Sequence, residues 1–385
     1  MGELMTIKDR SAFTNKQRIY DSLAKHGLDA VVVAQMENVV YCSGFYNMDL
    51  RILPDRICMV VWPREGDPVF VVPDRRAAGD GQMSFIDDIR GYKLLDGVFN
   101  HHPMEMVRDV LTEMGLTSGR IGYEPLYLPS YHADQLRFQL PDAKLVGCDY
   151  VMDEIRMVKT SAEIEQLRFT SVQTEKAIAN AYELARPGDT EKSIIDRMGF
   201  AVTKLGADFV FANVMAAGSR TPLGHHLGEE IPVDYGDIIR VDYGGSFDGY
   251  VSDLVRMAVV GPPNDRQRRV YGALSEGQHE VIDWLGPGQA MDEIAAKMKE
   301  ITGPKLPDDL DVVGFGHSIG LGIHDRPFIT PEDDRLTEPG MVMQIEHITT
   351  DGDELYHAED SVLFTEAGVT LLSDYTDTTE MYVIE

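Results

Sequence analysis

The chain has 385 residues, of which 43% are hydrophobic and 26% are charged. This length exceeds that of one hydrophobic core, and the composition is not that of a disordered chain, so we expect two globular domains. With 35 basic and 64 acidic residues the net charge is −29, and a surface this acidic argues against nucleic acid and membranes as partners.

The three cysteines are widely spaced and form no Cys-x-x-Cys pair. We therefore expect free, buried thiols at Cys42, Cys58 and Cys148, with neither a disulfide nor a zinc–thiolate site. No apolar run is long enough to span a bilayer, and no signal-peptide pattern is present. These features predict a cytoplasmic protein.

The first part of the chain combines one helical stretch with short apolar runs. Residues 15–26 have a helical pattern that stops at Gly27. The runs 29–34, 57–62 and 68–73 are apolar or β-branched and are bounded by turn residues. This pattern predicts a small α/β domain with a mixed sheet.

The character of the sequence changes near residue 155. Thr160 and Glu163 have the spacing of a capping box, in which each side chain accepts a backbone N–H of the other residue. The helix that they open runs towards residues 186–188. We therefore predict one domain over residues 1–155 and a second over residues 156–385.

The second domain repeats one pattern of elements. Two helices separated by a Pro-Gly turn at 187–188 end at Gly206, and strand-like segments follow. After Pro263, two further helices separated by a Pro-Gly turn at 287–288 end at Gly303, again before strand-like segments. The two turns are 100 residues apart, which predicts a duplicated unit.

The first half carries two carboxylates in a predicted hairpin. Strands on either side of a turn at 244–249, centred between Phe247 and Asp248, place Asp242 directly opposite Asp253. Residues directly opposed on one face of a sheet have Cβ atoms about 4.5–5.5 Å apart.

The second half carries a matching pair. A hairpin centred between Gly352 and Asp353 places Glu346 opposite Glu359. Opposed like charges destabilise a sheet, so one alternative is that both pairs point to solvent. A divalent cation reverses the sign of this energy, because the carboxylates then become its ligands. Two pairs at matching places in apolar strands favour a metal site.

A glycine-rich segment, residues 314–320, contains His317. Its glycines allow the backbone to approach the carboxylates and direct the imidazole at them. A phosphate-binding loop is excluded because no Gly-Lys-Ser/Thr follows. The remaining alternative is an ordinary core or surface histidine.

These motifs together resemble the pita-bread metallohydrolases, the family of aminopeptidase P, prolidase and methionine aminopeptidase. Residues 29–33 and 38–45 resemble a creatinase-type N-terminal domain, and residues 156–164 resemble the start of the catalytic domain. The resemblance implies an α/β (α+β) protein, with a creatinase-type N-terminal α/β domain followed by a pita-bread catalytic domain with an internal pseudo-twofold repeat. It assigns five metal ligands: Asp242, Asp253, His317, Glu346 and Glu359.

The resemblance also implies how these ligands divide the work. Asp242 and Glu359 would bridge two metals, Asp253 would bind one, and His317 and Glu346 the other. A hydroxide bridging the metals would attack the substrate, with Glu346 as the base. Four carboxylates and one imidazole suit Mn²⁺ best, with Fe²⁺, Co²⁺ or Zn²⁺ as alternatives.

Four further residues are candidate substrate contacts. The resemblance implies that His225 and His324 hold the substrate carbonyl and stabilise the tetrahedral intermediate. Relatives often have arginine where His357 stands, and usually proline where His347 stands, so we expect both histidines to alter the pocket wall. Arg220 is expected to meet a substrate carboxylate. The alternative for Arg220 is an exposed pair with Glu229 or Glu230.

The function implied is an Xaa-Pro dipeptidase or aminopeptidase that acts on a dipeptide or short peptide. One alternative is hydrolysis of a small non-peptide C–N bond in an amide-like molecule, as in creatinase or ectoine hydrolase. An alternative of another class is a pita-bread domain retained as a non-catalytic binding module. The resemblance also implies a homodimer.

Overall fold

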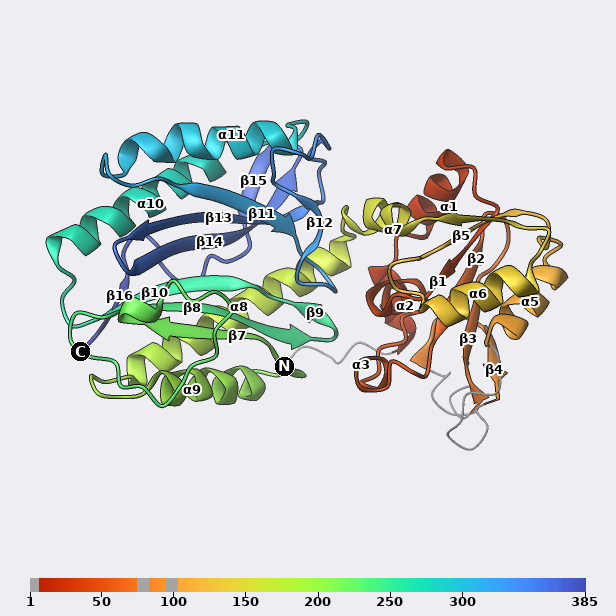
Figure 1. Cartoon of the computed structure of the whole chain (residues 1–385), viewed down its shortest axis with the longest axis horizontal. Helices are drawn as coiled ribbons and strands as arrows, with labels where there is room; N and C mark the ends of the chain where they lie inside the picture. Colours follow the sequence, from red (N-terminus) through yellow and green to blue (C-terminus); the bar gives the residue numbers. More distant parts are fainter. Residues whose placement is uncertain (1–6, 75–82, 94–102) are drawn as a thin grey trace. The chain divides into compact units, whose positions relative to one another are not determined.

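The computed structural model describes residues 7–74, 83–93 and 103–385. The chain divides into two compact units, Met1–Arg156 (unit 1) and Met157–Glu385 (unit 2). Both combine helices with sheets (Figure 1). No described helix combines the length and the apolar character that a membrane crossing requires.

Unit 1 contains a six-stranded mixed sheet in the order β4-β3-β2-β1-β5-β6. The pairs β1–β2 and β2–β3 are antiparallel, and the remaining neighbours are parallel. The mixed sheet predicted from the sequence is therefore confirmed. Its strands are β1 (Ala30–Val33), β2 (Met59–Pro63), β3 (Val69–Pro73), β4 (Asp88–Tyr92), β5 (Arg120–Tyr123) and β6 (Lys144–Gly147).

Helices cover this sheet and connect its strands. The helix predicted at 15–26 is α1, which Asn15 caps by accepting the N–H of Arg18. The cysteines of unit 1 are free and buried, as expected. The described helices of unit 1 are η1 (Ile7–Phe13), α1 (Lys16–Lys25), α2 (Met36–Ser43), α3 (Asp49–Ile52), α5 (Pro103–Glu113), α6 (Ser130–Gln139) and α7 (Asp149–Arg156).

Unit 2 consists of two halves with the same order of elements. In each half two helices precede antiparallel strands, and the strand order β10-β8-β7 of the first sheet corresponds to β14-β13-β11 of the second. The edge strand β16 joins the first sheet parallel to β10. The helices are α8 (Ser161–Leu184), α9 (Glu191–Lys204), η3 (Gly218–Arg220), α10 (Asp265–Trp284), α11 (Met291–Thr302) and η4 (Gly303–Lys305). The strands are β7 (Phe209–Ala217), β8 (Ile238–Phe247), β9 (Tyr250–Val251), β10 (Leu254–Val260), β11 (Val313–Ser318), β12 (Asp325–Phe328), β13 (Val342–Asp351), β14 (Glu354–Thr365), β15 (Gly368–Leu371) and β16 (Tyr382–Ile384).

The turns between the paired helices confirm the duplication. Gly188 donates its N–H to the carbonyl of Val233 at 2.9 Å, and Gly288 donates to that of Thr337 at 2.8 Å. Both glycines have positive φ, 89° and 84°, a conformation that glycine adopts without steric cost. The capping box of Thr160 and its partner, which opens α8, is present as predicted.

Helices and sheets of unit 2 enclose apolar layers. Residues of α8 and α9 pack against the first sheet, and residues of α10 and α11 pack against the second. In Figure 1, α9 and α11 lie at the outer sides of the first and the second sheet. A third apolar cluster joins β10, β14 and α10. Polar residues such as Asp242 therefore share the inner face of the first sheet with the apolar residues of this third cluster.

The first hairpin differs from the prediction in its register. Its turn is the dipeptide Asp248-Gly249, so Asp242 lies opposite Val255 and not opposite Asp253. Both turn residues have positive φ, 52° and 87°, as a two-residue type I′ turn requires and as Asp-Gly favours. The predicted six-residue turn over 244–249 was wrong because four of its residues continue strand β8.

The second hairpin has the predicted register. Glu346 lies directly opposite Glu359, and the strands close around Gly352-Asp353. Its glycine has a φ of 63°. The prediction succeeded here because the turn was centred on its two actual residues.

Candidate metal centre

The five predicted ligands converge on the inner side of the two sheets of unit 2. Glu346 and Glu359 are cross-strand partners on β13 and β14. His317 lies on β11, and Asp242 on β8. Asp253 lies between β9 and β10. Each half of the duplicated unit therefore contributes carboxylates to one place.

The side chains approach one another within the reach of a metal ion. His317 Nε2 lies 3.4 Å from Glu346 Oε1 and 3.7 Å from Asp253 Oδ2. Ligand atoms of His317, Glu346 and Glu359 lie within 4.8 Å of one another, and so do those of Asp242, Asp253 and Glu359. Glu359 belongs to both groups, which is the position that the bridging role requires.

A break in the first hairpin directs Asp253 into this cluster. Ser252 and Asp253 belong to neither β9 nor β10. A Cβ at Gly244 would lie 1.9 Å from the carbonyl oxygen of Ser252, so only glycine allows the backbone to approach here. Asp253 precedes Val255 by two residues, and Val255 is the cross-strand partner of Asp242. The alternation of side chains therefore places Asp253 on the same side as Asp242.

Gln344 connects the two halves behind the carboxylates. Its Nε2 donates to Glu359 Oε1 at 2.8 Å and also to the backbone carbonyl of Asp253. The amide thereby fixes one ligand from each half. Sequence reasoning did not identify Gln344, although its alternation with Glu346 on one strand was a usable signal.

The electrostatics of the cluster suit a cation. Burial, followed by the charges of Glu359 and Asp242, holds the pKa of Asp253 well above its ordinary value. Burial and the charges of Glu346 and Asp242 do the same for the pKa of Glu359. Asp253 Oδ1 is buried and has no hydrogen-bond partner among the described residues. A divalent cation would satisfy that oxygen and remove the repulsion.

The pKa of Glu346 behaves differently. Burial alone would raise it, but hydrogen bonds from His317 and His357 lower the pKa overall. His357 Nε2 lies 3.1 Å from Glu346 Oε2. His357 therefore contacts the residue proposed as the base, on the same face of β14 as Glu359.

His347 does not line the site. It is completely buried on β13, and neither of its ring nitrogens has a partner within the described ranges. Because side chains alternate along a strand, it points to the face opposite that of Glu346. The expectation that His347 alters the pocket wall was therefore wrong.

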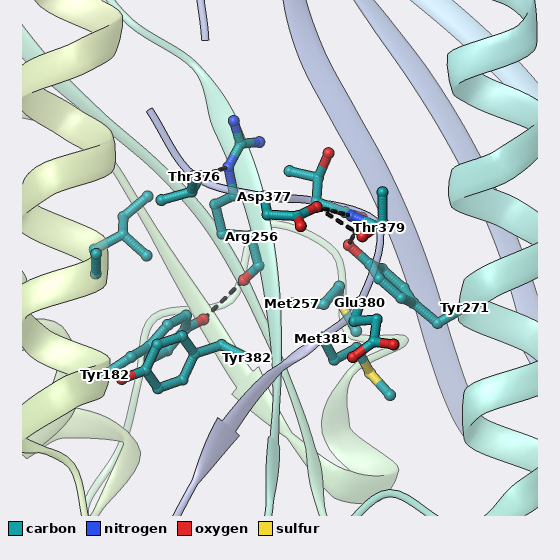
Figure 2. A pocket seen from close by; sticks show the side chains of 13 residues that line it. Tyr182, Arg256, Met257, Tyr271, Thr376, Asp377, Thr379, Glu380, Met381 and Tyr382 are labelled. Carbon is teal, nitrogen blue, oxygen red and sulfur yellow. Dashed lines mark hydrogen bonds between the residues drawn. The ribbon is translucent and has the colours of Figure 1, made fainter. Parts of the chain in front are cut away.

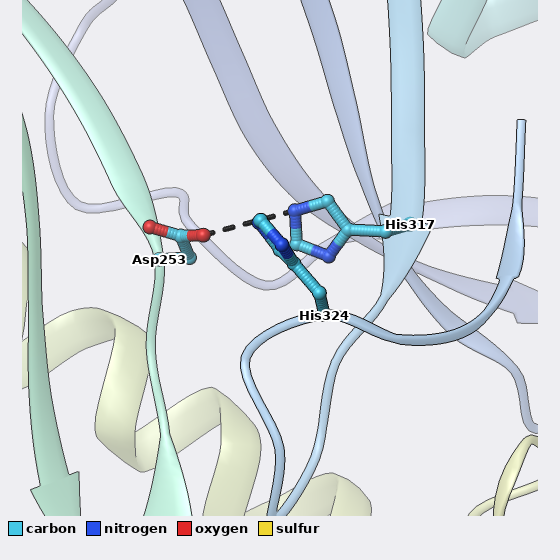
Figure 3. A group of neighbouring side chains, drawn as sticks. All are labelled: Asp253, His317 and His324. Atoms are coloured by element: carbon cyan, nitrogen blue, oxygen red, sulfur yellow. Dashed lines mark ion pairs between the residues drawn. The ribbon is translucent and has the colours of Figure 1, made fainter. Parts of the chain in front are cut away.

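His324 stands beside the cluster. Its ring centroid lies 4.4 Å from that of His317, edge to face, and Figure 3 shows both rings next to Asp253. Burial, together with the charges of His317 and His225, lowers the pKa of His324. His225 itself is an exposed residue on the loop after η3.

Arg220 forms ion pairs with glutamates near its own loop. Its Nε lies 3.2 Å from the buried Glu191 Oε1, and its Nη2 lies 3.0 Å from Glu229 Oε2. Nη2 also contacts the ring of His226 at 2.5 Å. The structure thus has the pair with Glu229 that the sequence left as the alternative. The contacts of Arg220 with described residues do not include any of the five predicted metal ligands.

Arg256 contacts the backbone of the proposed ligand Glu359. It donates to the backbone carbonyl of Glu359 at 2.8 Å, and it pairs with Glu175 and Asp360 at 2.8 and 2.9 Å. It also lines a cavity of about 470 Å³. In Figure 2 the hydroxyl of Tyr182 donates to the Arg256 carbonyl. None of the five predicted ligands lines this cavity.

Comparisons with known proteins place these features in a family. The model of metallopeptidase family M24 matches residues 165–366, and the model of the creatinase/prolidase N-terminal domain matches residues 16–158. An Xaa-Pro dipeptidase of Pyrococcus furiosus is 31% identical over 229 residues, which are 58% of this chain and 65% of that protein. An Xaa-Pro dipeptidase of Pyrococcus horikoshii is 24% identical and covers 91% of this chain and 94% of its own.

Solved structures share the fold. The structure of an Xaa-Pro dipeptidase from Bacillus anthracis superposes with a TM-score of 0.83 at 21% sequence identity. The match covers 98% of this chain and 100% of that one. At this identity the likeness concerns the fold alone.

Proposed function

The chain belongs to metallopeptidase family M24 and has a creatinase/prolidase N-terminal domain before its pita-bread catalytic domain; on this premise, we propose that it is an Xaa-Pro dipeptidase or aminopeptidase. It would hydrolyse the peptide bond before proline in a dipeptide or short peptide. The relatives named Xaa-Pro dipeptidase support this substrate class.

One observation carries the proposal. Four buried carboxylates and one buried imidazole from both halves of unit 2 form two groups of three that share Glu359, each with its ligand atoms within 4.8 Å of one another. Two divalent ions, Mn²⁺ by preference, would supply Lewis-acid activation of the scissile carbonyl. Their proposed ligands are Asp242, Asp253, His317, Glu346 and Glu359.

The protein's own residues would then handle the proton and the developing charge. Glu346 takes the proton of the attacking water and passes it to the leaving nitrogen. His357 keeps that carboxylate oriented through their 3.1 Å contact. His225 and His324 hold the substrate carbonyl and stabilise the negative charge that forms on its oxygen.

A second candidate keeps the chemistry and changes the substrate. The contact between His357 and Glu346 gives this pocket a compact imidazole in place of the arginine that relatives often carry. This feature favours a small amide-like molecule, as in creatinase- or ectoine-hydrolase-like cleavage of a non-peptide C–N bond.

A hydrolysis screen separates these candidates. The Mn²⁺-loaded protein is offered Xaa-Pro dipeptides, longer peptides with proline at the second position, creatine and ectoine. Turnover of the proline peptides supports the proposal, and turnover of creatine or ectoine alone replaces it with the second candidate. No turnover of any substrate by a fully metal-loaded protein would point to the binding-module alternative.

The setting of this activity is part of the proposal. We place the N-terminal domain at residues 1–155 and the catalytic domain at residues 156–385. The protein is proposed to be a cytoplasmic homodimer. Sedimentation equilibrium across a range of concentrations tests the dimer.

A further inference from the structure

Arg240 lies beside the carboxylate cluster. It precedes Asp242 by two residues on β8, so both side chains point to the same face of the sheet. Only 7% of Arg240 is exposed. A guanidinium stays charged in proteins and carries five N–H donors, so its burial requires partners.

Those partners are incomplete. Nη2 lies 3.4 Å from Asp242 Oδ2, and Nη1 lies 3.5 Å from the carbonyl oxygen of Gly224. A charge-assisted N–H···O bond is normally about 2.7–2.9 Å long. Nε is buried and has no hydrogen-bond partner in the part of the chain that the structure describes.

Arg256 shows what a saturated guanidinium looks like in the same sheet. It is 6% exposed, but four of its contacts, to Thr376 Oγ1, Glu175, Asp360 and the Glu359 carbonyl, measure 2.8–2.9 Å. Arg240 has equal burial and no contact of that quality. A buried N–H donor without a hydrogen bond of normal length destabilises the fold. This cost indicates that the N–H groups of Arg240 form hydrogen bonds with a bound ligand.

The neighbours of Arg240 place that ligand in the substrate site. Gly224 directly precedes His225, and Asp242 is a proposed metal ligand. The four carboxylates of the cluster and two divalent cations have equal and opposite charge. The charge of Asp242, the carboxylate beside Arg240, would then be shared with a cation, which would leave the guanidinium able to pair with another anion.

We propose that Arg240 is a specificity-determining residue that binds a carboxylate of the substrate. Its planar fork of N–H groups matches a carboxylate in a two-bond pair. The inference rests on the proposed function in one respect, that the ligand is the free carboxylate of a dipeptide. It gives Arg240 the role that the sequence had suggested for Arg220, whose guanidinium is held by Glu191 and Glu229.

Binding of matched acid and amide probes tests the proposal without turnover. Calorimetry on the Mn²⁺-loaded protein compares L-proline with L-prolinamide, and acetate with acetamide. We expect the wild type to prefer the acid, and Arg240→Gln to reduce that preference about 10- to 100-fold. Arg240→Lys should retain part of it, because the charge remains and the fork is lost. Arg268→Gln, an exposed change on α10, and Arg220→Gln should leave the preference unchanged.

Metal content, measured on every variant by mass spectrometry, identifies the competing explanation. An unchanged acid preference in Arg240→Gln would overturn the proposal and reduce Arg240 to a counter-ion of Asp242, as would loss of metal with no change in preference. If no proline peptide is hydrolysed but the acetate preference still depends on Arg240, the proposed function fails and the inference about Arg240 stands.

Discussion

Asp253 is held in a position that the protein alone does not favour. It is buried against Glu359 and Asp242, its pKa is raised, and one of its oxygens lacks a partner among the described residues. We expect Asp253→Asn to lose tight binding of at least one metal ion, because an amide oxygen carries no net charge. Metal content after dialysis, measured by mass spectrometry, checks this.

Asp248→Asn is the matched control. Asp248 lies on the same hairpin with a φ of 52°, which asparagine tolerates. This variant should keep both metals. Full occupancy of two divalent ions in Asp253→Asn would remove Asp253 from the ligand set.

The two histidines beside the cluster should separate catalysis from metal binding. His225→Ala and His324→Ala are expected to keep both metals and to lose about 10²–10³ in kcat, the usual loss for one electrostatic contact to a developing oxyanion. His279→Ala, whose ring contacts Thr378, should retain the wild-type rate. If His324→Ala loses a metal instead, His324 belongs with the ligands, since it shares a group with Asp253 and His317.

At the scale of single residues, the sequence identified the carboxylates proposed as metal ligands, but it did not identify most of the residues that hold the site in place. Asp242 and Glu359 could be found because acidic residues in apolar strands are conspicuous. Glu191 acts through contacts with residues distant in the sequence, and no local pattern marks such contacts. Gln344 and Arg240 each lie two residues before a predicted ligand, so strand alternation was the one signal for them. Arg220 shows the reverse case, since its place near His225 in the sequence suggested a role that its partners do not support.

Among the elements, the loop that carries His225 is fixed at its base by the start of a helix. Glu191, the first residue of α9, is completely buried. It accepts the backbone N–H groups of Ala217 and Glu229 at 2.9 and 3.1 Å, besides its contact with Arg220. A single carboxylate thus joins both ends of the loop.

Glu191→Gln should loosen this loop without disturbing the metals. A neutral amide cannot accept from all three donors, so we expect faster hydrogen exchange over residues 217–229 and a fall in kcat of about tenfold or more, with KM less affected. Glu293→Gln, an exposed change in the first turn of α11, is the control. Combining Glu191→Gln with His225→Ala should add little to His225→Ala alone; fully additive losses would show that Glu191 does not act through His225.

The strand registers show which elements can be derived from sequence. Both hairpins close on a dipeptide that contains glycine, and only the hairpin whose centre was placed on that dipeptide was predicted in register. The break at Ser252-Asp253 was not predictable, because it depends on how closely Gly244 approaches across the ladder. The helix after residue 15 and the capping box of Thr160 followed from local spacing and agreed with the structure.

Across the whole molecule, the duplication of unit 2 explains why the site forms at all. Neither half contains a complete ligand set, and the faces that carry the carboxylates meet only when both halves fold. A bound metal ion therefore links the two halves and should stabilise unit 2 by mass action. Unit 1, which contributes none of the five proposed ligands, should gain nothing directly.

The two tryptophans allow each unit to be followed by itself. The chain has two, Trp62 in β2 of unit 1 and Trp284 at the end of α10 in unit 2. Trp284→Phe leaves a signal from unit 1, and Trp62→Phe leaves one from unit 2. Comparing each variant with and without Mn²⁺ cancels the effect of the substitution itself.

Denaturant unfolding of these two variants tests the coupling of metal to fold. At a Mn²⁺ concentration about 100 times Kd, the Trp284 signal should report about 2.7 kcal/mol of added stability, while the Trp62 signal should not move. Asp253→Asn in the Trp62→Phe background should abolish the gain, because the ion then has lost a ligand from the first half. An equal shift of both signals would show that the two units unfold together, and no shift in either would count against a metal site that joins the halves of unit 2.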